Sequence, residues 1–112
     1  MAKILYVADG MQRSIVKVLL EQRGHTIKIV KDFDEVTLFL GNEPDVTAII
    51  WEVTANGVII APDHISRVKK SFPSVRNFGV AGGPIWLPAL QGAGCLDVFR
   101  FFDLVDGVCN AL

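Results

Sequence analysis

Apolar and polar positions alternate along this chain in two rhythms, one typical of strands and one typical of helices. The segment from Lys3 to Asp9 contains an unbroken apolar run, Ile4 to Val7, which predicts a strand covered on both faces. Apolar residues then recur at helical spacing, at Ile15, Val16, Leu19 and Leu20. A buried strand followed by an amphipathic helix is the first half of a βαβ unit. In an open parallel sheet, a site would form at the carboxyl end of that strand.

The same alternation continues to the end of the chain. Further strands are predicted at 25–30, 46–51, 75–81 and 95–99. Helices are predicted at 9–23, with Gly24 as a left-handed stop, from Asp32 or Asp34 to 42, from Pro62 to 72, at 85–91 with an interruption at Pro88, and at 103–112. The second helix should turn Val36, Leu38, Phe39 and Leu40 inward. The loop at 53–61 should fold Val58, Ile59 and Ile60 onto the sheet.

Strands that alternate with helices predict a parallel sheet, because a parallel crossover connection needs a dozen or more residues. We expect a flavodoxin-like α/β fold, a three-layer α/β/α sandwich with a five-stranded sheet in the order 2-1-3-4-5. The 112 residues suffice for one compact domain, 1–112, and not for two.

Composition narrows the class of protein further. Half of the chain is apolar and 21% is charged, which is typical of a globular domain. The net charge of −1 argues against a nucleic-acid partner. No apolar run approaches the roughly 20 residues of a membrane span, and the N-terminus has no signal-peptide pattern. We therefore expect a cytoplasmic protein whose cysteines, Cys95 and Cys109, are reduced and buried.

Three segments give the chain a resemblance to the response-regulator receiver family, the CheY-like domains. Residues 3–9 resemble the first strand of that family, which ends in a pair of acidic residues. Residues 44–50 resemble the lead-in to the phosphoacceptor aspartate, and residues 89–94 resemble the alanine- and glycine-rich approach to the fifth strand. The resemblance covers essentially the whole chain and implies the fold expected above.

The resemblance also implies a set of site residues, and this sequence departs from it. In the family, the acidic pair and the phosphoacceptor aspartate hold magnesium, while a Thr or Ser and a Lys contact the phosphoryl oxygens. Here Asp9 matches the second acid, but the other positions read as follows: Ala8 at the first acid, no Asp in the Ile50–Glu52 stretch, Ala81 at the Thr/Ser position, and Phe101, or Arg100 in a register shifted by one, at the Lys position.

We interpret the chain as a pseudo-receiver that is not an enzyme and needs no cofactor. Asp9 is then a weak magnesium ligand or only a helix cap, and the two readings stay open. Glu52 is a mimic of a phosphorylated side chain or a solvated acid. We expect Trp51 to fill the hollow where a phosphoryl group would sit.

Apolar residues near the C-terminus suggest a partner surface. Trp86, Leu87, Phe99, Phe101 and Phe102 are more than two short helices can easily bury. The resemblance places the interface on the face of the fourth helix, the fifth strand and the last helix. The partner would be another signalling protein or a second copy of the chain. Packing of these residues in the core is the alternative.

Two rival functions remain. One is a phosphorylatable receiver with a displaced acidic site built from Glu52 or another acid and Asp9. The other is a small-ligand domain of flavodoxin type that binds at the junction of the first and third strands.

Overall fold

The computed structural model describes residues 2–7, 13–31, 33–43, 45–52, 61–80, 87–100 and 103–112. Its centre is a five-stranded parallel sheet in the order β2-β1-β3-β4-β5, which confirms the predicted fold class and strand order. The elements in chain order are β1 (Lys3–Val7), α1 (Arg13–Gln22), β2 (Thr26–Val30), α2 (Phe33–Asn42), β3 (Ala48–Glu52), α3 (Ala61–Ser71), β4 (Arg76–Val80), α4 (Leu87–Ala93), β5 (Asp97–Phe99) and α5 (Leu104–Ala111).

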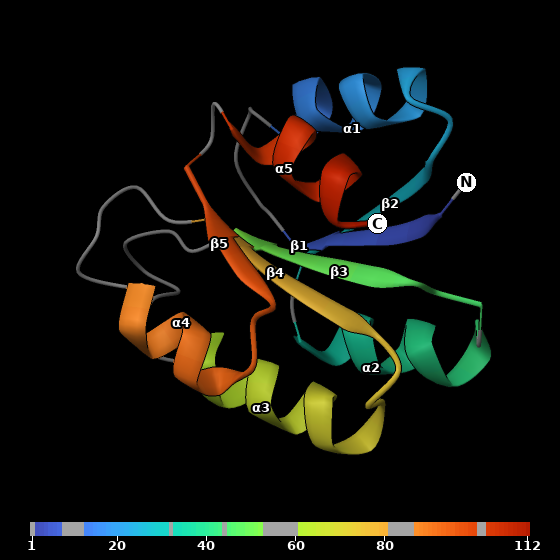
Figure 1. Ribbon diagram of the computed structural model, residues 1–112. Helices are drawn as coiled ribbons and strands as arrows, with labels where there is room; N and C mark the ends of the chain where they lie inside the picture. Colours follow the sequence, from blue (N-terminus) through green and yellow to red (C-terminus); the bar gives the residue numbers. More distant parts are fainter. Residues whose placement is uncertain are drawn as a thin grey trace.

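Helices cover both faces of the sheet, with α1 and α5 on one face and α2, α3 and α4 on the other (Figure 1). Consecutive strand residues point to opposite faces. Leu5 and Ile49 therefore join the cluster under α2, α3 and α4, while their neighbours Tyr6 and Ile50 join the cluster under α1 and α5. All four are fully buried, which explains why β1 and β3 read as continuous apolar runs.

The strand register sets which residues meet at the carboxyl edge of the sheet. Val7 of β1 pairs with Trp51 of β3. One residue further along, Glu52 pairs with Val80 of β4, and Val80 pairs with Phe99 of β5. Glu52, Val80 and Phe99 thus form a row across the end of three strands.

Several predicted details need correction. Leu38 is 65% exposed and not on the inner face of α2, because Val36 and Leu40, one turn apart, occupy the buried side. Pro88 does not interrupt a helix. It is the second residue of α4, where a backbone N–H has no partner within the helix. Strand β5 begins at Asp97, two residues later than predicted.

Other predicted details hold or lie outside the described residues. Gly24 has a φ of 89°, the left-handed stop that the sequence predicts after α1. Cys95 and Cys109 are free thiols, but only Cys95 is buried as expected, whereas Cys109 is partly exposed. The predicted start of the first helix at 9–12 and the loop residues Val58, Ile59 and Ile60 lie outside the described part of the chain.

Candidate functional site

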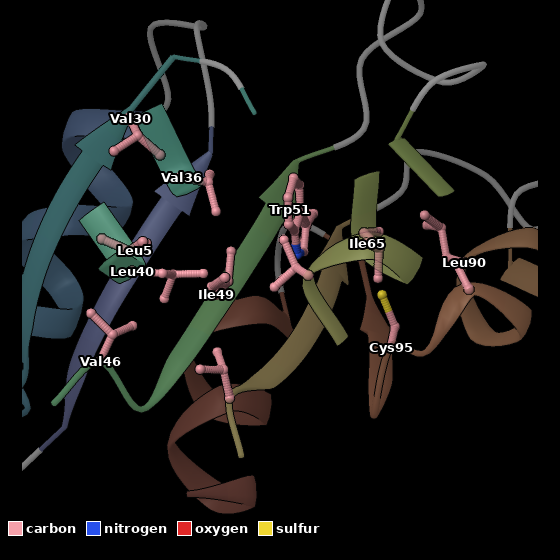
Figure 2. Packing of buried hydrophobic residues seen from close by; sticks show 13 residues of the cluster. Leu5, Val30, Val36, Leu40, Val46, Ile49, Trp51, Ile65, Leu90 and Cys95 are labelled. Atoms are coloured by element: carbon pink, nitrogen blue, oxygen red, sulfur yellow. The ribbon is translucent and has the colours of Figure 1, made fainter. Parts of the chain in front are cut away.

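Trp51 is held inside the core at the carboxyl end of β3. Its side chain is 3% exposed and lies in the cluster under α2, α3 and α4, where Figure 2 shows it between the side chains of Ile49 and Ile65. The indole Nε1 donates a hydrogen bond of 3.0 Å to Oδ1 of Asn77 on β4. Asn77 is itself only 2% exposed. The pair satisfies two polar groups that would otherwise be buried without a partner.

Glu52, the next residue, turns to the opposite face of the sheet. Its Oε2 accepts a hydrogen bond from the hydroxyl of Tyr6 on β1. Tyr6 is fully buried, whereas Glu52 is partly exposed. Burial, and then the neighbouring carboxylate, raise the pKa of Tyr6 well above its ordinary value. Tyr6 is therefore a neutral hydrogen-bond donor at neutral pH, and one oxygen of Glu52 is engaged.

Phe99 packs against α5. Its ring stacks on Phe78 with 6.1 Å between the ring centroids. It also lies directly against the backbone of Gly107, where an added Cβ would come within 2.3 Å of the ring. Phe99 is half-buried in this position. Of the residues predicted to form an interaction surface, this one contributes to the core, which was the alternative that the sequence left open.

The other predicted site residues are only partly placed. Arg100 is exposed, one residue beyond the end of β5, and its carbonyl accepts a hydrogen bond from the amide of Asp103. Leu87 is the first residue of α4, with its side chain outside the described part. The remaining predicted site residues, which lie outside the described ranges, are Ala8, Asp9, Ala81, Trp86, Phe101 and Phe102.

The described donors at this strand end do not fit magnesium. Magnesium prefers a near-octahedral set of oxygen ligands. The described residues supply one carboxylate here, that of Glu52, and it already accepts the Tyr6 hydroxyl. Across the described ranges, no group of three or more His, Cys, Asp or Glu residues is placed to hold a metal ion.

The buried thiol of Cys95 is also unreactive at neutral pH. Cys95 lies in the same cluster as Trp51, and burial raises the pKa of its thiol to about 12 although Lys69 opposes the shift. A thiol with so high a pKa is a poor nucleophile at neutral pH. Cys95 therefore acts as a packing residue.

Sequence reasoning missed the two hydrogen-bond partners, Tyr6 and Asn77. Both could have been found, because each is a polar side chain that adjoins apolar residues of a strand, and a buried polar group requires a partner. The sequence did not say which partner each would choose.

Solved structures of response regulators share this fold. No family model and no curated protein matches the sequence. A response regulator from Thermotoga maritima is 20% identical, with a TM-score of 0.83, and the match covers 98% of this chain and 96% of that one. A LuxR family DNA-binding response regulator from Silicibacter pomeroyi is 22% identical, with a TM-score of 0.80, over 97% of this chain and 89% of that one.

A third similar structure is a CheY-like response regulator receiver domain protein from Methanospirillum hungatei. It is 17% identical, with a TM-score of 0.80, over 99% of this chain and 93% of that one. At these identities, the similarity establishes the receiver-type fold and leaves the site to be judged on its own residues. None of the helices in the described ranges is long and apolar enough to cross a membrane.

Proposed function

We propose that this chain is a receiver-like signalling module that acts through protein–protein contact, without phosphorylation of an aspartate. It would be a single non-enzymatic domain in the cytoplasm. The observation that carries the proposal is the end of β3, where Trp51 is bonded to Asn77 and Glu52 is bonded to Tyr6. The first side chain is held inside the core, and one oxygen of the Glu52 carboxylate is already engaged.

The chemistry of phosphoryl transfer supports the same conclusion. A transferring phosphoryl group needs cations and hydrogen-bond donors around its oxygens. The sequence has Ala8 and Ala81 where the family resemblance implies an acid and a hydroxyl, and Phe101, or Arg100 in a register shifted by one, where it implies a lysine. Apolar side chains at these positions cannot bind magnesium or stabilise the transferred charge. Switching of the domain would then depend on a partner that prefers one conformation.

Phosphorylation can be tested directly by intact mass. Incubation of the protein with acetyl phosphate and magnesium should leave its mass unchanged. A phosphoryl adduct that is present in the wild type and absent in Glu52→Gln would overturn the proposal in favour of a receiver with a displaced acidic site.

Tryptophan fluorescence tests the same point without a covalent step. The chain has two tryptophans, so Trp86→Phe makes Trp51 the sole reporter at the end of β3. Magnesium with beryllofluoride, a mimic of the phosphoryl group, should leave its emission unchanged because the described donors do not fit the metal. Saturable quenching would contradict the proposal.

The proposed partner surface is the face formed by α4, β5 and α5, with Trp86, Leu87 and Phe102 as its apolar contacts. Phe99 of β5 is half-buried against Gly107 of α5, which joins two of these elements. If the partner is a second copy, the mass in solution should rise with protein concentration, and Trp86→Ala should lower association. Ile15→Ala, which truncates an exposed isoleucine on α1, is the matched control. A strict monomer at high concentration would exclude the second copy as the partner.

The small-ligand alternative makes a separate prediction. A flavodoxin-type site would raise the melting temperature of the protein in the presence of flavin mononucleotide or other nucleotides. We expect no stabilisation by these compounds.

A further inference from the structure

Strand β2 forms one edge of the sheet, at the opposite end from β5 (Figure 1). A groove of about 530 Å³ runs along this edge between α1 and α2. Its lining comes from α1, from β2 with the residue that follows it, and from α2: Ser14, Lys28, Ile29, Lys31, Glu35, Leu38 and Phe39, which include two lysines and one glutamate. The groove therefore lies beside the open side of a strand and is bordered by a helix from each face of the sheet.

The backbone of β2 offers hydrogen-bonding groups toward this groove. In a parallel ladder, alternate residues direct their N–H and C=O groups to the same neighbouring strand. The amide of Thr26 donates to the carbonyl of Ala2, 2.9 Å away, so Thr26 and every second residue after it face β1. Ile27 and Ile29 must then face outward. Within the described ranges β2 pairs with β1 alone, which leaves this side free for another strand.

The outward row ends at Lys31. Its amide also points away from β1, and it donates to Oε2 of Glu35 on α2 over 2.8 Å. An added strand would thus form backbone hydrogen bonds with Ile27 and Ile29. It would end before Lys31, whose amide already donates to Glu35.

Apolar side chains stand on both sides of the open edge. Leu38 on α2 is 65% exposed, and Val18 on α1, one helical turn beyond Ser14, is 51% exposed. The two helices cover opposite faces of the sheet. An added strand would direct alternate side chains to these two faces. A peptide with apolar residues on both faces would therefore contact Val18 on one side and Leu38 on the other.

The charge of the groove selects among occupants. Lys28 and Lys31 line it and are both exposed, with Nζ of Lys28 lying 5.3 Å from the ring centroid of Phe39. The carboxylate of Glu35 is turned toward the amide of Lys31. A second copy that paired antiparallel through β2 about its central residue would set Lys28 opposite Lys28, which is unfavourable. An acidic chain would be attracted instead.

We propose that β2 is a docking site for an extended, acidic segment of another protein, which adds to the sheet as a sixth strand. Backbone bonds to Ile27 and Ile29 would supply affinity. Contacts with Val18 and Leu38 and ion pairs with Lys28 and Lys31 would supply specificity. This site lies at the other end of the sheet from the face proposed above and does not depend on that proposal.

The first test measures binding of a fluorescein-labelled peptide of eight residues by fluorescence anisotropy. Pairs of glutamates alternate with pairs of valines in this peptide, so that each face of the added strand carries both residue types. We expect saturable binding, weakened about fivefold by Lys28→Glu through the loss and reversal of one exposed ion pair. Lys70→Glu, which reverses an exposed lysine on α3, is the matched control and should bind as the wild type does. An absence of saturable binding, or equal weakening by both variants, would overturn the proposal.

The second test separates strand addition from simple charge attraction. Two versions of the peptide carry N-methyl groups on alternate residues, one version for each parity. Strand addition requires that only one version loses binding, because only one edge of the peptide faces β2. Amide chemical shifts should move at Ile27 and Ile29 when the unmodified peptide binds. Equal affinity of both methylated versions and the parent would refute the sixth strand.

Discussion

The two faces of the sheet differ in how buried polar groups find hydrogen-bond partners at the end of β3. On the side of α2, α3 and α4, Trp51 and Asn77 form a neutral pair in which both residues are buried. On the side of α1 and α5, the buried Tyr6 bonds to the partly exposed carboxylate of Glu52. One residue separates the two solutions in sequence, and the pleat of the strand sends them to opposite faces.

The difference shows that the degree of burial decides whether a position can hold a charged side chain or only a neutral one. A fully buried position favours a neutral pair, because an ion there would lose its hydration. A position near the edge can keep a carboxylate, because water still reaches part of it. The Trp51–Asn77 pair should therefore contribute only to stability, whereas the other side should also respond to pH because the pKa of Tyr6 is raised.

The largest effect is expected from Trp51→Ala. Removing the ring leaves a cavity and an unpaired Asn77, and should lower the free energy of unfolding by about 3–5 kcal/mol. Urea denaturation followed by circular dichroism measures this cost. Trp51→Phe, which keeps most of the buried area, should cost less. A loss below about 1 kcal/mol for Trp51→Ala would mean that the indole is not packed as described.

On the α5 side, Gly107→Ala should cost about 1–3 kcal/mol, because the new methyl group would overlap the ring of Phe99. Thermal unfolding measures the change. Gly92→Ala in α4 is the control, since its Cβ would meet open space. That variant should be neutral or slightly more stable, by about 0.5 kcal/mol. Equal effects of the two substitutions would contradict the close contact between Phe99 and α5.

Tyr6→Phe should lower stability by about 1 kcal/mol at neutral pH. It removes one hydrogen bond to a carboxylate that water partly solvates, so the cost is below that of a buried charged pair. Chemical denaturation measures the loss. Glu52→Gln should be milder than Tyr6→Phe, since an amide oxygen still accepts the hydroxyl, and the reverse order would argue against the pair.

An effect no larger than that of Tyr6→Phe is expected in alkali. The pKa of Tyr6 is raised in the folded state, so above the ordinary tyrosine pKa of 10.0 the unfolded chain loses this proton first. The unfolded state then binds fewer protons, and stability falls as pH rises, by about 1 kcal/mol between pH 10 and 11. Tyr6→Phe should remove this part of the slope.

The ionisation of Tyr6 can also be measured directly. The chain has a single tyrosine, so tyrosinate absorbance near 295 nm reports Tyr6 alone. Its ionisation should coincide with unfolding, and not precede it. A normal titration in the folded protein would show that Tyr6 is not buried against Glu52.

The sequence by itself determined the order of elements and the class of fold. Its apolar runs and helical spacings predicted strands that alternate with helices, and therefore a parallel sheet. The number of strands in a chain of this length favoured the order 2-1-3-4-5, which the structure has. The end of α1 at Gly24 could also be predicted from the local sequence, because glycine adopts the left-handed backbone conformation without steric cost.

Tertiary structure alone decided which side chains meet. Tyr6 and Glu52 are 46 positions apart, and Trp51 and Asn77 are 26 apart, so strand register had to bring them together. It also decided that Leu38 faces solvent while Phe99 packs under α5. A pattern of apolar residues predicts that a side chain is buried. Which residue it packs against depends on how distant segments come together.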